Sequence, residues 1–74
     1  MPLNMVSKGS EVVLKNIFWG EKLKRKLQDM GLTPGVKLKV VSDSGKGPVV
    51  IDVRGTRLAL GRGILNKIYV DGAA

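Results

Sequence analysis

The sequence predicts a mainly β protein, a small barrel of about five strands with one α-helix, at about residues 20–30, between the first and second strands. Short segments that alternate apolar and polar residues recur between turns rich in Gly and Pro, a pattern typical of strands. Only residues 20–30 carry apolar residues at clear helical spacing. At 74 residues the chain suits one domain, and closing short strands into a barrel removes exposed edges.

The N-terminal part is expected to hold a turn followed by the first strand. We expect residues 1–7 to fray, and we assign 8–74 to a single domain. Lys8-Gly9-Ser10 has the composition of a turn, and residues 11–17 are rich in strand-forming types. Val12 and Leu14 share one face of that strand, whereas Ile17 falls on the other, so a β-bulge is needed to bring Ile17 back.

Residues 20–30 are predicted to form the helix. Leu23, Leu27 and Met30 follow i, i+4, i+7 spacing and form an apolar stripe with which the helix would plug or flank an open end of the barrel. A second stripe, mostly basic and expected to face outward, comprises Lys22, Arg25, Lys26 and Asp29. Gly31 suits the left-handed position after a helix, and Pro34 prevents the helix from continuing.

Four strands are expected after the helix. Thr33-Pro34-Gly35-Val36 suits a type II turn. Alternation then predicts strands at residues 36–41, 49–54 and 57–60, and a short last strand at 68–70. Gly55-Thr56 is predicted to be the two-residue connection of a type II′ hairpin, and residues 61–67 leave room for about one helical turn. Five short, strongly bent strands in a chain of this size fit an SH3-like barrel.

The composition excludes several kinds of chemistry. The chain has no Cys and no His, which removes disulfides, Cys/His zinc sites, iron–sulfur clusters, haem His ligands and Ser-His-Asp triads. The six carboxylates are scattered, without the spacing of a metal or acid–base pair. We therefore predict no catalytic residue, cofactor or metal site, and no enzymatic activity. No segment has the length of a membrane helix or the pattern of a secretory signal, so we expect a cytoplasmic protein.

The charge favours an anionic partner. Thirteen Lys and Arg against six Asp and Glu give a formal net charge of +7, which suits nucleic acid, anionic lipid or an acidic protein surface, or simply solubility. A nucleic-acid-binding barrel is the alternative function, although such proteins usually add stacking aromatics and this chain has only Phe18, Trp19 and Tyr69. Phe18 is expected in the core, whereas Trp19 suits a core or an interface equally. The candidate docking residues are Trp19, Lys22, Arg25, Lys26, Lys46 and Arg57.

The segment Leu27-Gln28-Asp29-Met30-Gly31-Leu32-Thr33-Pro34-Gly35 resembles the "L-x-x-M-G-L-x-P-G" signature of the FeoA family, small cytoplasmic proteins of bacterial ferrous-iron uptake. The resemblance covers roughly residues 8–71, because it extends through the Gly47-Pro48 loop to the closing Ile68-Tyr69-Val70. The matched residues are explained by backbone conformation or burial, so they mark the family without marking a binding site. The signature residues are Leu27, Met30, Gly31, Leu32, Pro34, Gly35 and Gly55.

The resemblance implies an SH3-like barrel and an accessory role beside FeoB, the membrane ferrous-iron transporter that carries a cytoplasmic nucleotide-binding domain. The expected mechanism is docking on the cytoplasmic part of FeoB, near the membrane. A chain without His or Cys is not expected to carry the iron itself. Iron homeostasis and transition-metal binding are implied only at the level of the family, and no residue pattern distinguishes activation, inhibition or assembly of the transporter.

Overall fold

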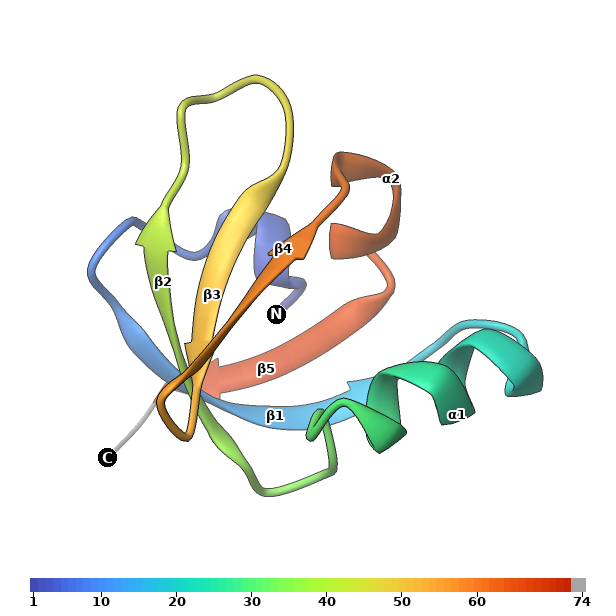
Figure 1. Ribbon diagram of the computed structural model, residues 1–74. Helices are drawn as coiled ribbons and strands as arrows, with labels where there is room; N and C mark the ends of the chain where they lie inside the picture. Colours follow the sequence, from blue (N-terminus) through green and yellow to red (C-terminus); the bar gives the residue numbers. More distant parts are fainter. Residues whose placement is uncertain (73–74) are drawn as a thin grey trace.

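The computed structural model describes residues 1–72, which form a strongly bent, five-stranded antiparallel sheet (Figure 1). The strands are β1 (Glu11–Ile17), β2 (Lys37–Ser42), β3 (Val49–Val53), β4 (Thr56–Leu60) and β5 (Ile68–Gly72). They lie in the order β4-β3-β2-β1-β5, with α1 (Glu21–Asp29) between β1 and β2 in the sequence and α2 (Arg62–Leu65) between β4 and β5. This is the predicted mainly β architecture with a helix after the first strand.

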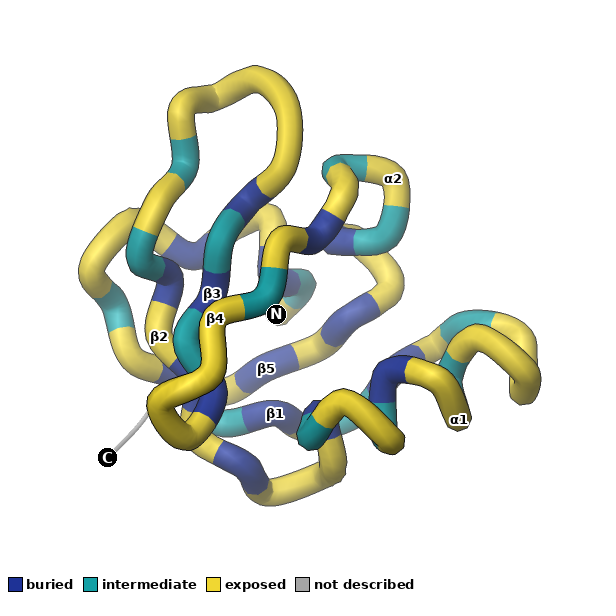
Figure 2. Tube along the Cα trace, in the orientation of Figure 1, coloured by how far each residue is buried: buried dark blue, intermediate teal, exposed yellow. Residues whose placement is uncertain are grey.

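Successive side chains of a strand point to opposite faces, so every second side chain points into the bend of the sheet. The buried positions in Figure 2 gather there. In β1, Val12 and Leu14 are buried, and the register with β5 shifts between Leu14 and Asn16. This irregularity returns Ile17 to the core, as predicted. The other strands contribute Leu38, Val40, Val49, Ile51, Val53, Leu60, Ile68 and Val70.

The N-terminal segment differs from the frayed end expected for residues 1–7. Leu3 and Val6 are buried in the core, and a 3-10 helix, η1 (Leu3–Met5), lies against β5 and α2. The backbone of Met1 exchanges two hydrogen bonds with Val70, each 2.8 Å long, and Pro2 forms a bridge with Tyr69. Two features explain why this segment packs against the barrel instead of fraying. The side chains of Leu3 and Val6 and the backbone edge of β5 would otherwise be exposed to water.

Helix α1 ends as the sequence predicts. Gly31 has φ +101°, its N–H donates to the Gln28 carbonyl at 3.0 Å, and the Leu32 N–H donates to the Leu27 carbonyl at 3.1 Å. These two bonds are those of a Schellman motif, which satisfies the last carbonyls of the helix. The motif turns Leu32 back into the core, where it is completely buried.

The apolar stripe of α1 is only partly used, contrary to prediction. Leu27 is buried, but Leu23 and Met30 are 39% and 43% exposed. Successive helical residues turn by about 100°, so Leu23 and Met30 lie about 40–60° around the axis from Leu27, to one side of the contact. The helix therefore touches the barrel along a narrow line, and Figure 1 shows it lying at the rim. No helix within residues 1–72 is long and apolar enough to cross a membrane.

Of the two predicted turns, the one before β2 is confirmed and the one between β3 and β4 is displaced. The Val36 N–H donates to the Thr33 carbonyl at 3.1 Å and Gly35 has φ +91°, which confirms the type II turn. The hairpin between β3 and β4 was predicted one residue too late. Its two central residues are Arg54 and Gly55, with φ +54° and +83°, and two positive φ values indicate type I′ rather than type II′.

Candidate functional site

Side chains able to bind a metal do not gather anywhere in residues 1–72. In that range no three Asp or Glu side chains lie close enough to hold a metal ion. No polar or charged residue of the same range is buried. The features described below are therefore surfaces.

Helix α1 presents a face of mixed charge to solvent. Five exposed side chains line a shallow groove of about 490 Å³ there: Glu21, Lys22, Arg25, Lys26 and Asp29. Three bases and two acids give this face a net charge of +1. The face points away from the barrel because Leu27, the buried side chain of the helix, lies on the other side. The structure thus brings together Lys22, Arg25 and Lys26, three of the predicted docking residues.

The other three predicted docking residues lie outside this groove. Trp19, just before α1, is half-buried and packs against the core, so it lies near the helix without being fully exposed. Lys46 is exposed in the loop between β2 and β3, and Arg57 is exposed on β4. In Figure 1 the β2–β3 loop and α1 are at opposite ends of the view. Lys46 therefore does not share one surface with the helix.

An exposed aromatic pair is a feature that the sequence reasoning missed. Phe18, expected in the core, is 58% exposed, and its ring meets the ring of Tyr69 edge-on, with centroids 5.0 Å apart and planes at 87°. Alternation explains the error: Ile17 points inward, so the next side chain points outward. Beside the pair, Lys15 and Asp71 form an exposed ion pair of 3.8 Å.

The outer face of the sheet carries a ladder of alternating charges. Glu11 on β1 is opposite Lys39 on β2, Lys39 is opposite Asp52 on β3, and Asp52 is opposite Arg57 on β4. Two acids and two bases make the ladder neutral, and cross-strand pairs of opposite charge favour this register. Asp52 accepts a hydrogen bond from the Gly55 N–H at 2.9 Å, and neither ion pair found in residues 1–72 involves it.

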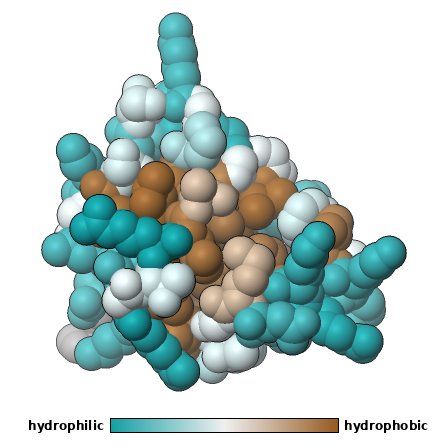
Figure 3. All heavy atoms as spheres, viewed as in Figure 1, coloured by the Kyte–Doolittle hydropathy of each residue, from teal (hydrophilic) through white to brown (hydrophobic). Residues whose placement is uncertain are grey.

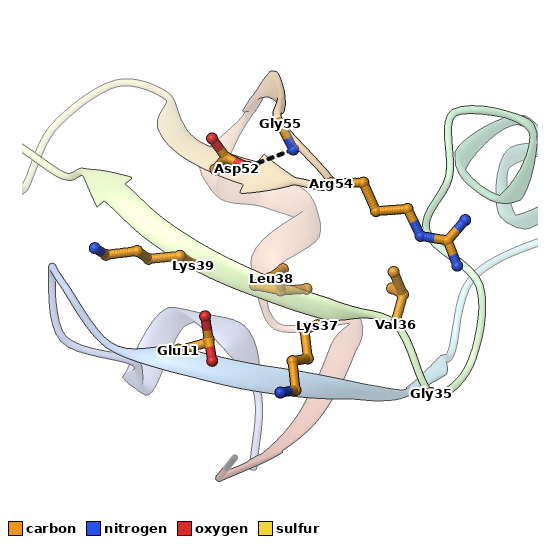
Figure 4. A pocket seen from close by; sticks show the side chains of 9 residues that line it. All are labelled: Glu11, Gly35, Val36, Lys37, Leu38, Lys39, Asp52, Arg54 and Gly55. Carbon is orange, nitrogen blue, oxygen red and sulfur yellow. Dashed lines mark hydrogen bonds between the residues drawn. The ribbon is translucent and has the colours of Figure 1, made fainter.

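Figure 4 shows the pocket of about 360 Å³ beside this ladder, with the Lys37, Lys39 and Arg54 side chains extending from its walls. These three cations were not among the predicted site residues. Alternation along β2 shows that Lys37 and Lys39 share the outward face. Their acidic neighbours Glu11 and Asp52, however, come from other strands and depend on a register that one sequence does not reveal.

A contact with α2 anchors the loop after β2. The Asp43 carboxylate accepts hydrogen bonds from the Gly45 N–H, at 2.9 Å, and from the Arg62 guanidinium of α2. The Gly45 N–H and the Arg62 side chain hold the pKa of Asp43 below its ordinary value. This contact joins the loop that carries Lys46 to α2, so the loop has a defined position.

Comparison with known proteins identifies the family. A family model described as the FeoA domain matches residues 1–72. The protein of Methanocaldococcus jannaschii named "Putative Fe(2+) transport protein A" is 40% identical over 72 residues, which are 97% of this chain and 87% of that protein.

Solved structures agree with this assignment. A crystal structure of an iron uptake regulatory protein (FeoA) superimposes with a TM-score of 0.89 at 34% identity, over 99% of this chain and 97% of that one. The fold is also that of Stenotrophomonas maltophilia FeoA, described as a procaryotic SH3 domain protein and crystallised with zinc. It matches with a TM-score of 0.84 at 22% identity, over 96% of this chain and 89% of that one. With its SH3-like sheet and the glycine-capped helix end in place, this chain belongs to the FeoA family.

Proposed function

We propose that this chain is a cytoplasmic accessory protein of ferrous-iron uptake that docks on the cytoplasmic part of the transporter FeoB. It would act by contact, biasing one state of the transporter, and not by carrying iron or by catalysing a reaction. Membership in the FeoA family, whose relatives include an Fe(2+) transport protein, supports a role in this transport.

The observation that carries the proposal is the outward face of α1. Its five charged side chains are exposed, and they stand on a helix that the core holds through Leu27. On this face two acids flank three bases, so a partner must match a charge pattern and not merely supply negative charge. That requirement favours a folded protein surface over an anionic lipid surface, because Glu21 and Asp29 would be repelled by anionic lipid.

The test is a titration of ¹⁵N-labelled protein with the cytoplasmic part of FeoB from the same organism, followed by amide chemical shifts. We expect shifts to concentrate on α1. The variant Lys22→Glu/Arg25→Glu should weaken binding by about tenfold, since it turns two attractive contacts into repulsive ones.

The matched control is Lys8→Glu/Lys37→Glu, which makes the same change in net charge at two exposed lysines outside the α1 face. It should bind within about twofold of the unmodified protein if recognition is local to α1. The absence of any shift at high micromolar concentration would refute docking on this part of FeoB. Equal losses in both variants would mean that only the overall charge matters.

Nucleic-acid binding is the second candidate, and the exposed Phe18–Tyr69 pair is the observation that favours it. Two features count against it. Lys15, which lines a shallow pocket together with Phe18 and Tyr69, is already paired with Asp71, and the edge-to-face contact covers part of one ring. Binding to single-stranded DNA or RNA that falls steeply with salt, and falls further in Phe18→Ala, would support this candidate.

A further inference from the structure

Strand β4 is the open edge of the sheet. It packs against β3, and it makes no comparable contact with any other element in residues 1–72. The opposite edge, β5, differs because the N-terminal residues Met1 and Pro2 pair with it at Val70 and Tyr69. The fold therefore covers one edge and leaves the other uncovered.

The register identifies which backbone groups of β4 are free. A two-residue hairpin loop makes Val53 and Thr56 a hydrogen-bonded pair, and bonded pairs then alternate along the ladder. Leu58 and Leu60 therefore bond to β3, whereas the N–H and C=O groups of Arg57 and Ala59 point away from it. Neither Arg57 nor Ala59 makes another hydrogen bond within residues 1–72. These four groups are the template to which an extended strand can bond.

An apolar surface lies beside this edge. Leu58 points inward from β4 but is only half-buried, because no further strand covers it. Figure 3 shows hydrophobic side chains gathered in a band across the middle of this face, in the region of β4, α2 and α1, with hydrophilic side chains around them. Exposed Leu23 on α1 and Met30 directly after it add apolar surface. A strand added to β4 would lay every second side chain over Leu58 and toward this band.

The charge beside the edge selects the occupant. Arg57 projects from the outer face of β4, and its neighbour across the hairpin, Asp52, forms no ion pair with it. A second copy of this chain would bring another Arg57 and another net charge of +7 to the same edge, which disfavours pairing of like with like. A segment with an acidic side chain opposite Arg57 and apolar side chains on the other face is attracted instead.

We infer that β4 is a strand-addition site, which receives an extended segment of the partner protein that alternates apolar and acidic residues. This inference rests on the proposed docking function and adds to it a backbone-mediated contact. The segment pairs with Arg57 and Ala59 as a sixth strand and covers Leu58. The α1 face then contacts the partner beyond the segment.

The first test needs no variant. Amide hydrogen exchange is measured for the free protein and for its complex with the cytoplasmic part of FeoB. The Arg57 and Ala59 amides should exchange fast in the free protein and at least about tenfold more slowly in the complex, whereas the Leu58 amide is slow in both. Binding without added protection at Arg57 and Ala59 would overturn the inference and leave the docking function standing. No binding at all would overturn both.

The second test uses Ala59→Pro, which removes one edge N–H at a position where β3 does not need it. Binding should weaken at least about tenfold, because a bond is lost and the ring obstructs the added strand. Ala59→Val keeps the N–H and should bind within about twofold. Circular dichroism establishes that both variants fold. If Ala59→Pro does not fold, the exchange measurement on the unmodified protein decides.

Two further measurements test the choice of an acidic partner segment: charge reversal at Arg57, and the oligomeric state of the protein alone. Arg57→Glu should weaken binding several-fold more than Lys37→Glu, an equal charge change on the outer face of β2. Equal effects would refute the acidic side chain opposite Arg57. Sedimentation equilibrium of the protein alone should show a monomer. A dimer that Ala59→Pro abolishes would show that the edge takes a second copy, which would overturn the choice of partner.

Discussion

Replacing Leu3 by Ala tests whether the N-terminal segment belongs to the folded domain. Leu3 is 2% exposed and part of the core cluster, although its position in the sequence suggests a loose end. A frayed segment would tolerate the change at no cost. A segment that helps to fill the core would not.

The size of the effect follows from burial. Leu→Ala removes three carbon atoms' worth of buried apolar surface, about 2.4 kcal/mol at about 0.8 kcal/mol for each group. Any cavity that remains adds to this figure, while a segment near a chain end can relax to fill it, so we expect a loss of about 2–3 kcal/mol. A 74-residue domain has a total stability of about 4–11 kcal/mol. The substitution therefore removes a large share, and the melting temperature should fall by about 10–20 °C.

The assay is urea unfolding followed by circular dichroism, with Met5→Ala as the control. Met5 is in the same 3-10 helix but is 68% exposed, so its truncation should change the free energy of unfolding by less than about 0.5 kcal/mol. If Leu3→Ala and Met5→Ala unfold at the same urea concentration as the unmodified protein, residues 1–7 contribute nothing to the domain and the packing argument is wrong.

Three further substitutions test backbone and charge. Gly31→Ala should cost about 1–2 kcal/mol in urea unfolding, because φ is +101° there and the added Cβ would be 3.9 Å from its nearest neighbour, so conformation and not collision sets the cost. Arg54→Asn should instead stabilise the hairpin by about 0.5–1 kcal/mol, since Asn tolerates the positive φ of the first type I′ position better than Arg; a loss would show that Arg54 makes a contact that outweighs its strain. Asp43→Asn should remove part of the pH dependence of stability. The Gly45 N–H and Arg62 depress the pKa of Asp43 in the folded state, so its contribution is complete above the unfolded pKa of about 4 and disappears as pH falls through the lower, folded pKa. The free energies of unfolding of Asp43→Asn and of the unmodified protein, measured between neutral and acid pH, should therefore differ most at neutral pH. A difference that stays constant with pH would contradict the assignment.

Local rules explain why much of this fold could be predicted. The end of α1 needs only Gly31, Leu32 and Pro34, and the hydrogen bonds that form there are those the pattern requires. The type II turn likewise depends on residues within a few positions. The irregularity before Ile17, which appears in the pairing of β1 with β5, was indicated by the spacing of the apolar residues in β1. The β3–β4 hairpin was misplaced by one residue because Arg is unusual at positive φ, and only the register between the strands reveals that it adopts this conformation.

The candidate site was harder to predict because it depends on contacts between distant segments. Helical spacing assembled Lys22, Arg25 and Lys26 correctly, but the same rule assigned Leu23 and Met30 to a core that does not reach them. An open barrel edge has no sequence signature of its own. It exists because β5 and not β4 received the N-terminal residues.

The distribution of charge, more than its total, argues for a specific protein partner. Nucleic-acid binding by a basic domain needs cations aligned along a phosphate backbone. Here the ladder across β1 to β4 is neutral, and the α1 groove has a net charge of +1. Most of the net charge of +7 therefore comes from side chains outside these two features. A net positive charge accelerates encounters with an acidic protein from many directions. Specificity is left to features that a phosphate backbone cannot match, namely a helix face on which two acids flank three bases and unpaired backbone groups on a strand edge.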